Sequence, residues 1–148
     1  MNLSDRERPL NKRGLRDAPV MGRRMKEHEI RPSLIVSSPA MRAWTTAKIV
    51  AEELGYPREF LQQEDGLYLA SLDKILDIVV AQDNGFNNLM LIGHNPGFTD
   101  FANFLVPRLT NNLPTAGVVS VEIDQDDWGL YERPATRLLV HDWPKKIS

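Results

Sequence analysis

The stretch Leu89-Met90-Leu91-Ile92-Gly93-His94-Asn95-Pro96-Gly97 indicates a strand, a turn and the start of a helix. Its apolar run is typical of a buried strand, and Asn-Pro-Gly predicts a tight turn. The amphipathic segment that follows, Phe98 to Leu105, predicts a helix. His94 then lies at the carboxyl end of a strand, the edge at which open α/β sheets bind ligands. A core histidine bonded to the backbone is the alternative interpretation.

A second junction of the same kind delivers an arginine. Leu34-Ile35-Val36-Ser37-Ser38-Pro39-Ala40-Met41-Arg42 predicts a strand, a turn and a helix start, with Arg42 in the first helical turn. A cation is unfavourable there against the helix dipole unless an anion is bound nearby. Arg42 and His94 together therefore predict a phosphate site, although a surface arginine would give the same pattern.

The remaining segments complete an alternation of helices and strands. We expect helices over 11–29, 43–54, 71–81 and 96–105, and strands over 33–37, 89–93, 118–123 and 137–142, with an extended segment near 60–62. Asn11 and Ser71 are the expected N-caps, Gly55 ends the second helix, and Pro96 is the expected first helical residue of the fourth. In the first helix we expect a bend at Pro19 and an apolar face of Leu15, Val20, Met21 and Met25. This order predicts one domain over 1–148, a three-layer α/β/α fold with a mostly parallel sheet.

Composition excludes several classes of function. The chain has 148 residues, 42% hydrophobic and 26% charged, with a net charge of −2 and no cysteine. Thiol catalysis, disulfides and cysteine metal sites are excluded, and three scattered histidines argue against a zinc site. No apolar run approaches the ~20 residues of a membrane span, so we expect a cytoplasmic protein without membrane contact. The basic stretch from Arg6 to Lys26 has helical spacing and predicts a solvated helix face, with no nucleic-acid partner.

Other polar residues are weaker candidates. The loop Thr115-Ala116-Gly117 could place N–H groups near a ligand, and Glu64 or Asp65 could serve as an acid. A loop without function is the favoured interpretation of the first, and solvated loop carboxylates are the commoner explanation of the other two. We expect an exposed position for His28 and a structural one for His141.

Five segments, in this order, resemble the histidine phosphatase superfamily and most closely its SixA-type phosphohistidine phosphatase branch. They are Arg8-Pro9-Leu10-Asn11-Lys12-Arg13-Gly14, Ser37-Ser38-Pro39-Ala40-Met41-Arg42-Ala43, Leu67-Tyr68-Leu69-Ala70-Ser71, Gly93-His94-Asn95-Pro96-Gly97 and Leu113-Pro114-Thr115-Ala116-Gly117. Each is a weak signal alone, and their shared order makes the resemblance specific. It implies a phosphoglycerate mutase-like fold.

The resemblance also implies a mechanism. In the family, a histidine of an Arg-His motif attacks phosphorus, and two arginines and a second histidine hold the phosphoryl oxygens. Arg42 matches the second arginine and His94 the second histidine. No metal or organic cofactor is implied. The compact branch suits a histidine-phosphorylated protein as partner and substrate.

The chain departs from the family at its beginning. Its 148 residues contain no Arg-His pair, and Met1 is followed at once by residues that resemble the loop after the family's first strand. We therefore expect an N-terminally truncated domain that lacks the nucleophile and an interior strand beside Leu89–Gly93. Such a loss leaves backbone groups unpaired.

Three functions are open at this stage. The first is a phosphohistidine phosphatase-like hydrolase that uses a phosphohistidine enzyme intermediate and is inactive in the chain as given. The second is a non-catalytic phospho-ligand-binding protein. The third is a phosphomonoesterase for small molecules, which would depend on Glu64 or Asp65 as the acid.

Overall fold

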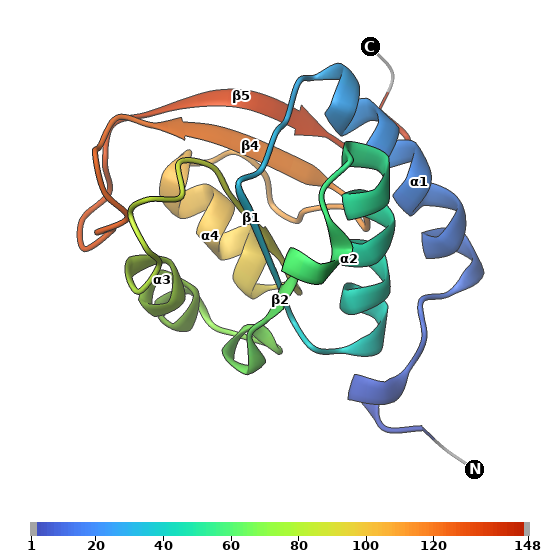
Figure 1. Cartoon of the computed structure of the whole chain (residues 1–148). Helices are drawn as coiled ribbons and strands as arrows, with labels where there is room; N and C mark the ends of the chain where they lie inside the picture. Colours follow the sequence, from blue (N-terminus) through green and yellow to red (C-terminus); the bar gives the residue numbers. More distant parts are fainter. Residues whose placement is uncertain (1–2, 147–148) are drawn as a thin grey trace.

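The computed structural model describes residues 3–146, and Figure 1 shows the order of the helices and strands. The helices are α1 (Lys12–Glu27), α2 (Met41–Leu54), α3 (Leu72–Val80) and α4 (Gly97–Leu105), with short 3₁₀ helices η1 (Asp5–Glu7), η2 (Arg58–Phe60) and η3 (Asp65–Leu67). The strands are β1 (Leu34–Ser37), β2 (Gln62–Gln63), β3 (Leu89–Ile92), β4 (Val118–Ile123) and β5 (Thr136–Asp142).

The helix ends follow the predicted capping residues. The side chain of Asn11 accepts a hydrogen bond from the Gly14 N–H at 2.8 Å, and Ser71 accepts one from the Lys74 N–H at 3.3 Å. Gly55 ends α2 in the left-handed conformation, with φ of 72°. Local sequence therefore fixes these three boundaries.

Two details of the helices differ from the sequence prediction. Leu15, expected on the apolar face of α1, is 51% exposed. The buried face of this helix includes Ala18, Met21 and Met25, and Leu15 lies outside it. Pro96 precedes α4 as its cap instead of occupying the first helical position, which Gly97 takes. Pro19 lies inside α1, which continues on both sides of it.

Two sheets make up the strand layer. In the first, β1 pairs in parallel with β2 and with β3, in the order β2-β1-β3, and Leu34 to Ser37 lie opposite Leu89 to Ile92. In the second, β4 and β5 form an antiparallel pair with an irregularity between Ser120 and Val121. Within residues 3–146, no strand pairs with the second edge of β3.

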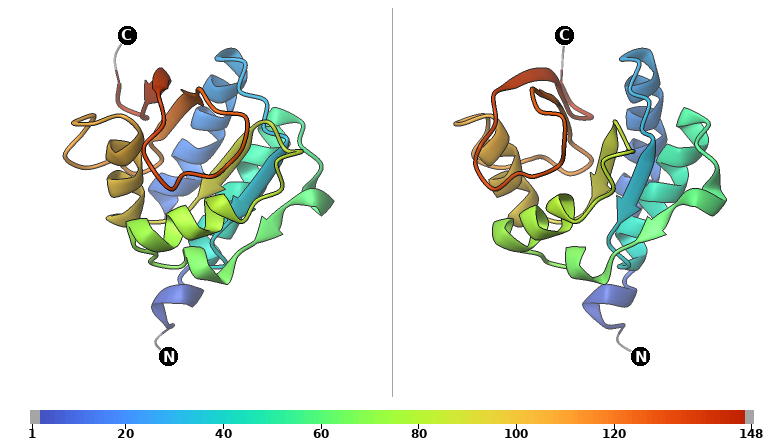
Figure 2. Two further views of the ribbon diagram at one scale, coloured as in Figure 1. Left: turned by 90° about the vertical axis from the view of Figure 1, so that its left-hand side faces the viewer. Right: turned by 60° about the vertical axis from the view of Figure 1, so that its left-hand side comes forward.

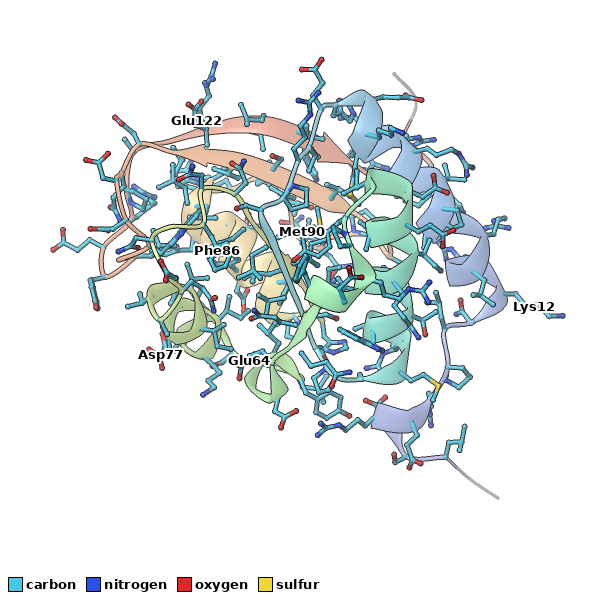
Figure 3. All side chains as sticks on the ribbon, viewed as in Figure 1. Lys12, Glu64, Asp77, Phe86, Met90 and Glu122 are labelled. Carbon is cyan, nitrogen blue, oxygen red and sulfur yellow. The ribbon has the colours of Figure 1, made fainter. Side chains whose placement is uncertain are left out.

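Helices cover both faces of the parallel sheet, so the predicted three-layer α/β architecture is confirmed (Figure 2). The layer of α1 and α2 packs through Met21, Met25 and Val50, and Met90 of β3 is directed toward it (Figure 3). On the opposite face, α3 and α4 enclose a larger core that includes Leu34, Val36, Ile75, Leu105 and Leu130. The basic face of α1 is solvated, since Lys12, Arg13, Arg16, Arg23 and Lys26 are exposed.

A close contact between α4 and the segment before α3 sets the position of the turn that holds His94. A Cβ atom added to Gly97 would lie 1.9 Å from the backbone oxygen of Ala70. Ala70 comes two residues after Tyr68, and Leu69 between them has a positive φ of 49°. Only glycine allows the start of α4 to approach this chain reversal so closely.

We expect Gly97→Ala to lower the free energy of unfolding by about 1–3 kcal/mol, because the added methyl group meets backbone that cannot rotate away. Urea denaturation of the purified variant measures this difference. The matched control is Gly85→Ala in an exposed loop, where the nearest atom is a flexible side-chain oxygen of Asp83 at 3.1 Å. It should change stability by less than about 0.5 kcal/mol. Equal stability of the two variants would contradict the assigned packing of α4.

Candidate functional site

The candidate site is built at the carboxyl ends of β1 and β3. These ends coincide because the strands are parallel and in register, with Ser37 opposite Ile92. The ladder continues one step further, since the Ser38 N–H donates to the Ile92 carbonyl at 2.9 Å. Residues that follow either strand are therefore held at one edge of the sheet, at the bottom of Figure 1.

His94 is fixed from two sides at this edge. Its Nε2 atom lies 2.7 Å from Ser38 Oγ, a hydrogen-bond distance, and Ser38 Oγ also accepts the Ala40 N–H at 3.2 Å. The ring of Tyr68 packs edge-on against the imidazole, with 5.6 Å between ring centroids. His94 is half-buried, and this burial, with a smaller effect from the Arg42 charge, lowers the pKa of His94 below its ordinary 6.5.

Arg42 extends from the first turn of α2 toward the N-terminal segment. Its Nη1 atom donates to the backbone oxygen of Asp5 at 2.8 Å, and its Nη2 atom lies 3.2 Å from Asp5 Oδ2. The nearest N–H groups of the helix start have no side-chain cap, because Ala40 offers none. Arg42 therefore meets an anionic group at the helix start where the sequence predicted one, and that group is a carboxylate of the chain itself.

Asp5 and Tyr68 join the arginine to the histidine. The Tyr68 hydroxyl donates a hydrogen bond to Asp5 Oδ2, the same oxygen that faces Arg42. The bond to Tyr68, together with the Arg42 guanidinium, holds the pKa of Asp5 below its ordinary value, despite an opposing effect of burial. The same bond raises the pKa of Tyr68 above its ordinary value. Asp5 is thus a carboxylate at neutral pH and Tyr68 a neutral phenol.

Arg6 adds a second positive charge beside this group. Its guanidinium carbon lies 5.5 Å from the centre of the Tyr68 ring, and its Nη2 atom lies 3.1 Å from Asp65 Oδ1. Arg8 is near enough to act on Asp5 electrostatically. We call Asp5, Ser38, Arg42, Tyr68 and His94 the edge cluster.

The sequence predicted two of these five residues as site residues. The structure brings both Arg42 and His94 to the same edge, as a common anion site requires. The sequence analysis missed Asp5, Ser38 and Tyr68 as participants. Tyr68 and Ser38 lie in segments that carry the family resemblance, and that was the available signal.

The weaker candidates have separate positions. The loop of Thr115-Ala116-Gly117 lies close to the His94 turn, because Asn95 Nδ2 donates to the Leu113 oxygen at 2.9 Å. Glu64, labelled in Figure 3, accepts the Gly66 N–H at 3.1 Å and caps η3. The side chain of Asp65 is 84% exposed and pairs with Arg6.

The other two histidines lie away from the edge cluster, at the end of α1 and in β5. His28 is exposed, as expected, and its Nε2 atom lies 3.7 Å from Asp142 Oδ2. His141 packs against Trp143 at 4.9 Å between ring centroids, and burial lowers its pKa. Neither ring is placed to meet a ligand at Arg42.

Residues 3–146 contain no group of three or more histidine and acidic side chains arranged to hold a metal ion. Over the same residues, no helix is both long enough and apolar enough to cross a membrane. The edge cluster offers a fixed guanidinium, a phenol and an imidazole that can accept or donate a proton.

The family that the sequence motifs resemble also matches part of the chain when the chain is compared with family models. Residues 4–67 match the model of the histidine phosphatase superfamily (branch 1). No significant match is found among curated protein sequences. The matched range contains three members of the edge cluster, Asp5, Ser38 and Arg42, and ends just before Tyr68.

Solved structures extend the likeness over nearly the whole chain. One is a candidate phosphohistidine phosphatase SixA from Agrobacterium tumefaciens, 23% identical, with a TM-score of 0.79 over 97% of this chain and 88% of that one. A second, from Nakamurella multipartitia, is 19% identical, with a TM-score of 0.80 over 99% and 90%. A third, the protein histidine phosphatase SixA complexed with tungstate, is 21% identical, with a TM-score of 0.78 over 97% and 89%. The chain therefore has the SixA-type fold, and the predicted resemblance to the histidine phosphatase superfamily is confirmed.

The pKa of His94 provides a test of the site geometry. We expect Arg42→Gln to raise this pKa toward 6.5, because the variant removes a positive charge that disfavours protonation. Titration of the imidazole protons by NMR measures the shift. The internal control is His141, whose pKa is lowered by burial and by Lys146 and should be the same in the variant. An unchanged pKa of His94 in Arg42→Gln would show that the guanidinium lies too far from His94 for a shared site.

The same shift makes stability depend on pH. Because the folded protein keeps His94 neutral where the unfolded chain binds a proton, the free energy of unfolding should decline as the pH falls below 6.5.

Proposed function

We propose that the edge cluster binds the phosphoryl group of a phosphohistidine and contributes the phosphoryl-holding half of a phosphohistidine phosphatase-like site. The observation that carries the proposal is the convergence of Arg42 and His94 at one sheet edge, with an acidic oxygen already held by Arg42. A guanidinium fork and an imidazole are suited to the equatorial oxygens of a phosphoryl group. The tungstate complex of a SixA protein supports an oxyanion at a site of this fold.

In the proposed reaction, a nucleophilic histidine nitrogen forms a bond to phosphorus while the P–N bond of the substrate breaks. The leaving imidazole takes a proton, and water later cleaves the enzyme phosphohistidine to release phosphate. Arg42 stabilises the charge that grows on the oxygens, and His94 holds an oxygen or supplies a proton. The nucleophile is not among the three histidines of this sequence, since His94 has the holding role and His28 and His141 lie elsewhere.

A non-catalytic phospho-ligand-binding protein is the second candidate. The absence of an Arg-His pair from the 148 residues favours it. Hydrolysis of small phosphomonoesters is less well supported, because it needs a strong acid at the leaving group. The two candidate acids have other roles: Glu64 caps η3, and the exposed carboxylate of Asp65 pairs with Arg6.

Anion binding tests the part shared by both candidates. We expect Arg42→Gln to weaken phosphate binding at least tenfold, since hydrogen bonds to charged groups contribute roughly 1.5–3 kcal/mol. His94→Asn should also weaken it, by a smaller factor. Isothermal titration with phosphate or tungstate measures both. The matched control is Arg58→Gln, an exposed arginine paired with Glu52 at 3.8 Å, which should leave the affinity unchanged. Equal binding by Arg42→Gln and Arg58→Gln would refute the proposed site.

Turnover separates the two candidates. We expect the chain alone to release phosphate from a phosphohistidine peptide no faster than the uncatalysed reaction, because among residues 3–146 the only histidine at the edge cluster is His94, which has the holding role. Added imidazole should accelerate the loss of the phosphohistidine if the site is catalytic, since free imidazole can accept the phosphoryl group in place of the nucleophile, and water then cleaves the phosphoimidazole to release phosphate. Arg42→Gln should abolish this acceleration. Binding without any acceleration would favour the binding protein. Robust release without imidazole, lost in His94→Ala, would show that the nucleophile lies within these residues after all.

A further inference from the structure

The carboxylate of Asp5 lies where an incoming anion would meet Arg42. We propose that Asp5 is an internal ligand of the anion site, which a phosphoryl group displaces, and that Tyr68 then donates its hydrogen bond to the phosphoryl oxygen. This inference rests on the proposed anion site at Arg42. It adds a competing residue and a further binding residue to that site.

Geometry supports the competition. Both terminal nitrogens of Arg42 face Asp5, one toward the backbone oxygen at 2.8 Å and the other toward Oδ2 at 3.2 Å. The two terminal nitrogens together form one planar fork of the guanidinium, and Asp5 occupies that fork. A phosphoryl group cannot bind this fork while Asp5 retains it.

Tyr68 is placed to serve either anion. Its hydroxyl donates to the Asp5 oxygen that faces Arg42, while its ring contacts the edge of the His94 imidazole. A phosphoryl oxygen that replaces Asp5 Oδ2 would accept from the same hydroxyl. The bound anion would then lie against Arg42, Tyr68 and His94 together. The family resemblance assigns only Arg42 and His94 to the phosphoryl group, so Tyr68 would be an additional donor.

Charge favours the exchange for a dianion. Arg6 stacks on Tyr68, and Arg8 acts on Asp5, so several positive charges surround one carboxylate. A phosphoryl dianion carries more charge and more acceptor oxygens than the carboxylate that it replaces. A monoanion carries the same charge as the carboxylate that it replaces, so it has no such electrostatic advantage. Asp5 should therefore disfavour the binding of chloride and acetate.

The segment that carries Asp5 can move at small cost. The carboxylate side chain is 49% exposed, and η1 is a three-residue turn that contains no buried residue. Its capping bonds, from the Glu7 N–H to Ser4 and from Ser4 Oγ to Glu7, lie within the turn itself. Release of Asp5 therefore leaves the packed core untouched.

Titration of tungstate and phosphate into the protein and its variants tests the inference. We expect Asp5→Asn and Asp5→Ala to bind either anion about three- to tenfold more tightly than the wild type, since an exposed ion pair and one hydrogen bond no longer compete. Tyr68→Phe should weaken binding in the Asp5→Ala background. The matched control is Asp65→Asn, which removes a neighbouring carboxylate that pairs with Arg6 and not with Arg42. At about 0.15 M salt it should change the affinity less than twofold.

The outcomes separate this inference from the proposed function. Binding that depends on Arg42 but is unchanged or weaker in both Asp5 variants would overturn the competition and make Asp5 a positioning residue. An equal gain in anion affinity in Asp65→Asn would show that the effect comes from the loss of a negative charge and not from the contact with Arg42. This result would also overturn the competition. Absence of anion binding in every variant, Asp5→Ala included, would overturn the anion site itself. Thermal unfolding of each variant should match the wild type, because Asp5 and Asp65 are exposed.

Discussion

The parallel pairing of β1 with β3 determines which residues of the chain meet at the candidate site. It brings two carboxyl ends to one edge, so that Ser38 and His94, separated by 56 positions, lie within hydrogen-bond distance. It also brings the segments that lead into α2 and α4 to that edge. A slip of one residue in this register would turn each side chain to the opposite face and separate the two residues.

Much of this fold can be predicted from the sequence because its signals are local. Caps at Asn11 and Ser71, the end of α2 at Gly55 and the apolar strands β1 and β3 each depend on a few neighbouring residues. The separation of β4 and β5 from the parallel sheet is not predictable from local sequence, because strand pairing is decided by distant contacts. The exposure of Leu15 has a similar cause, since partner helices decide which face of α1 is buried.

The same distinction between local signals and distant contacts applies to the residues of the candidate site. Arg42 and His94 each follow a predicted strand, and the rule for parallel sheets places both at one edge. Asp5 and Tyr68 lie in short irregular segments, and their contacts span 37 and 63 positions along the chain. Nothing in the neighbouring residues of Asp5 indicates that its carboxylate faces Arg42. Such a contact follows only from the path of the folded chain around the edge of the sheet.

The β4–β5 ribbon is attached to the remainder of the molecule by side chains instead of a shared backbone ladder. Thr136 Oγ1 donates to the Leu105 oxygen at 2.7 Å, and Arg24 donates to the oxygens of Trp143 and Pro144 at 2.9 and 3.2 Å. Each attachment can break without disturbing the pairing inside the ribbon. The ribbon can therefore separate from the parallel sheet without breaking a shared backbone ladder, and the cost of that opening is set by the apolar surface of Val121 and Ile123, which pack against the larger core.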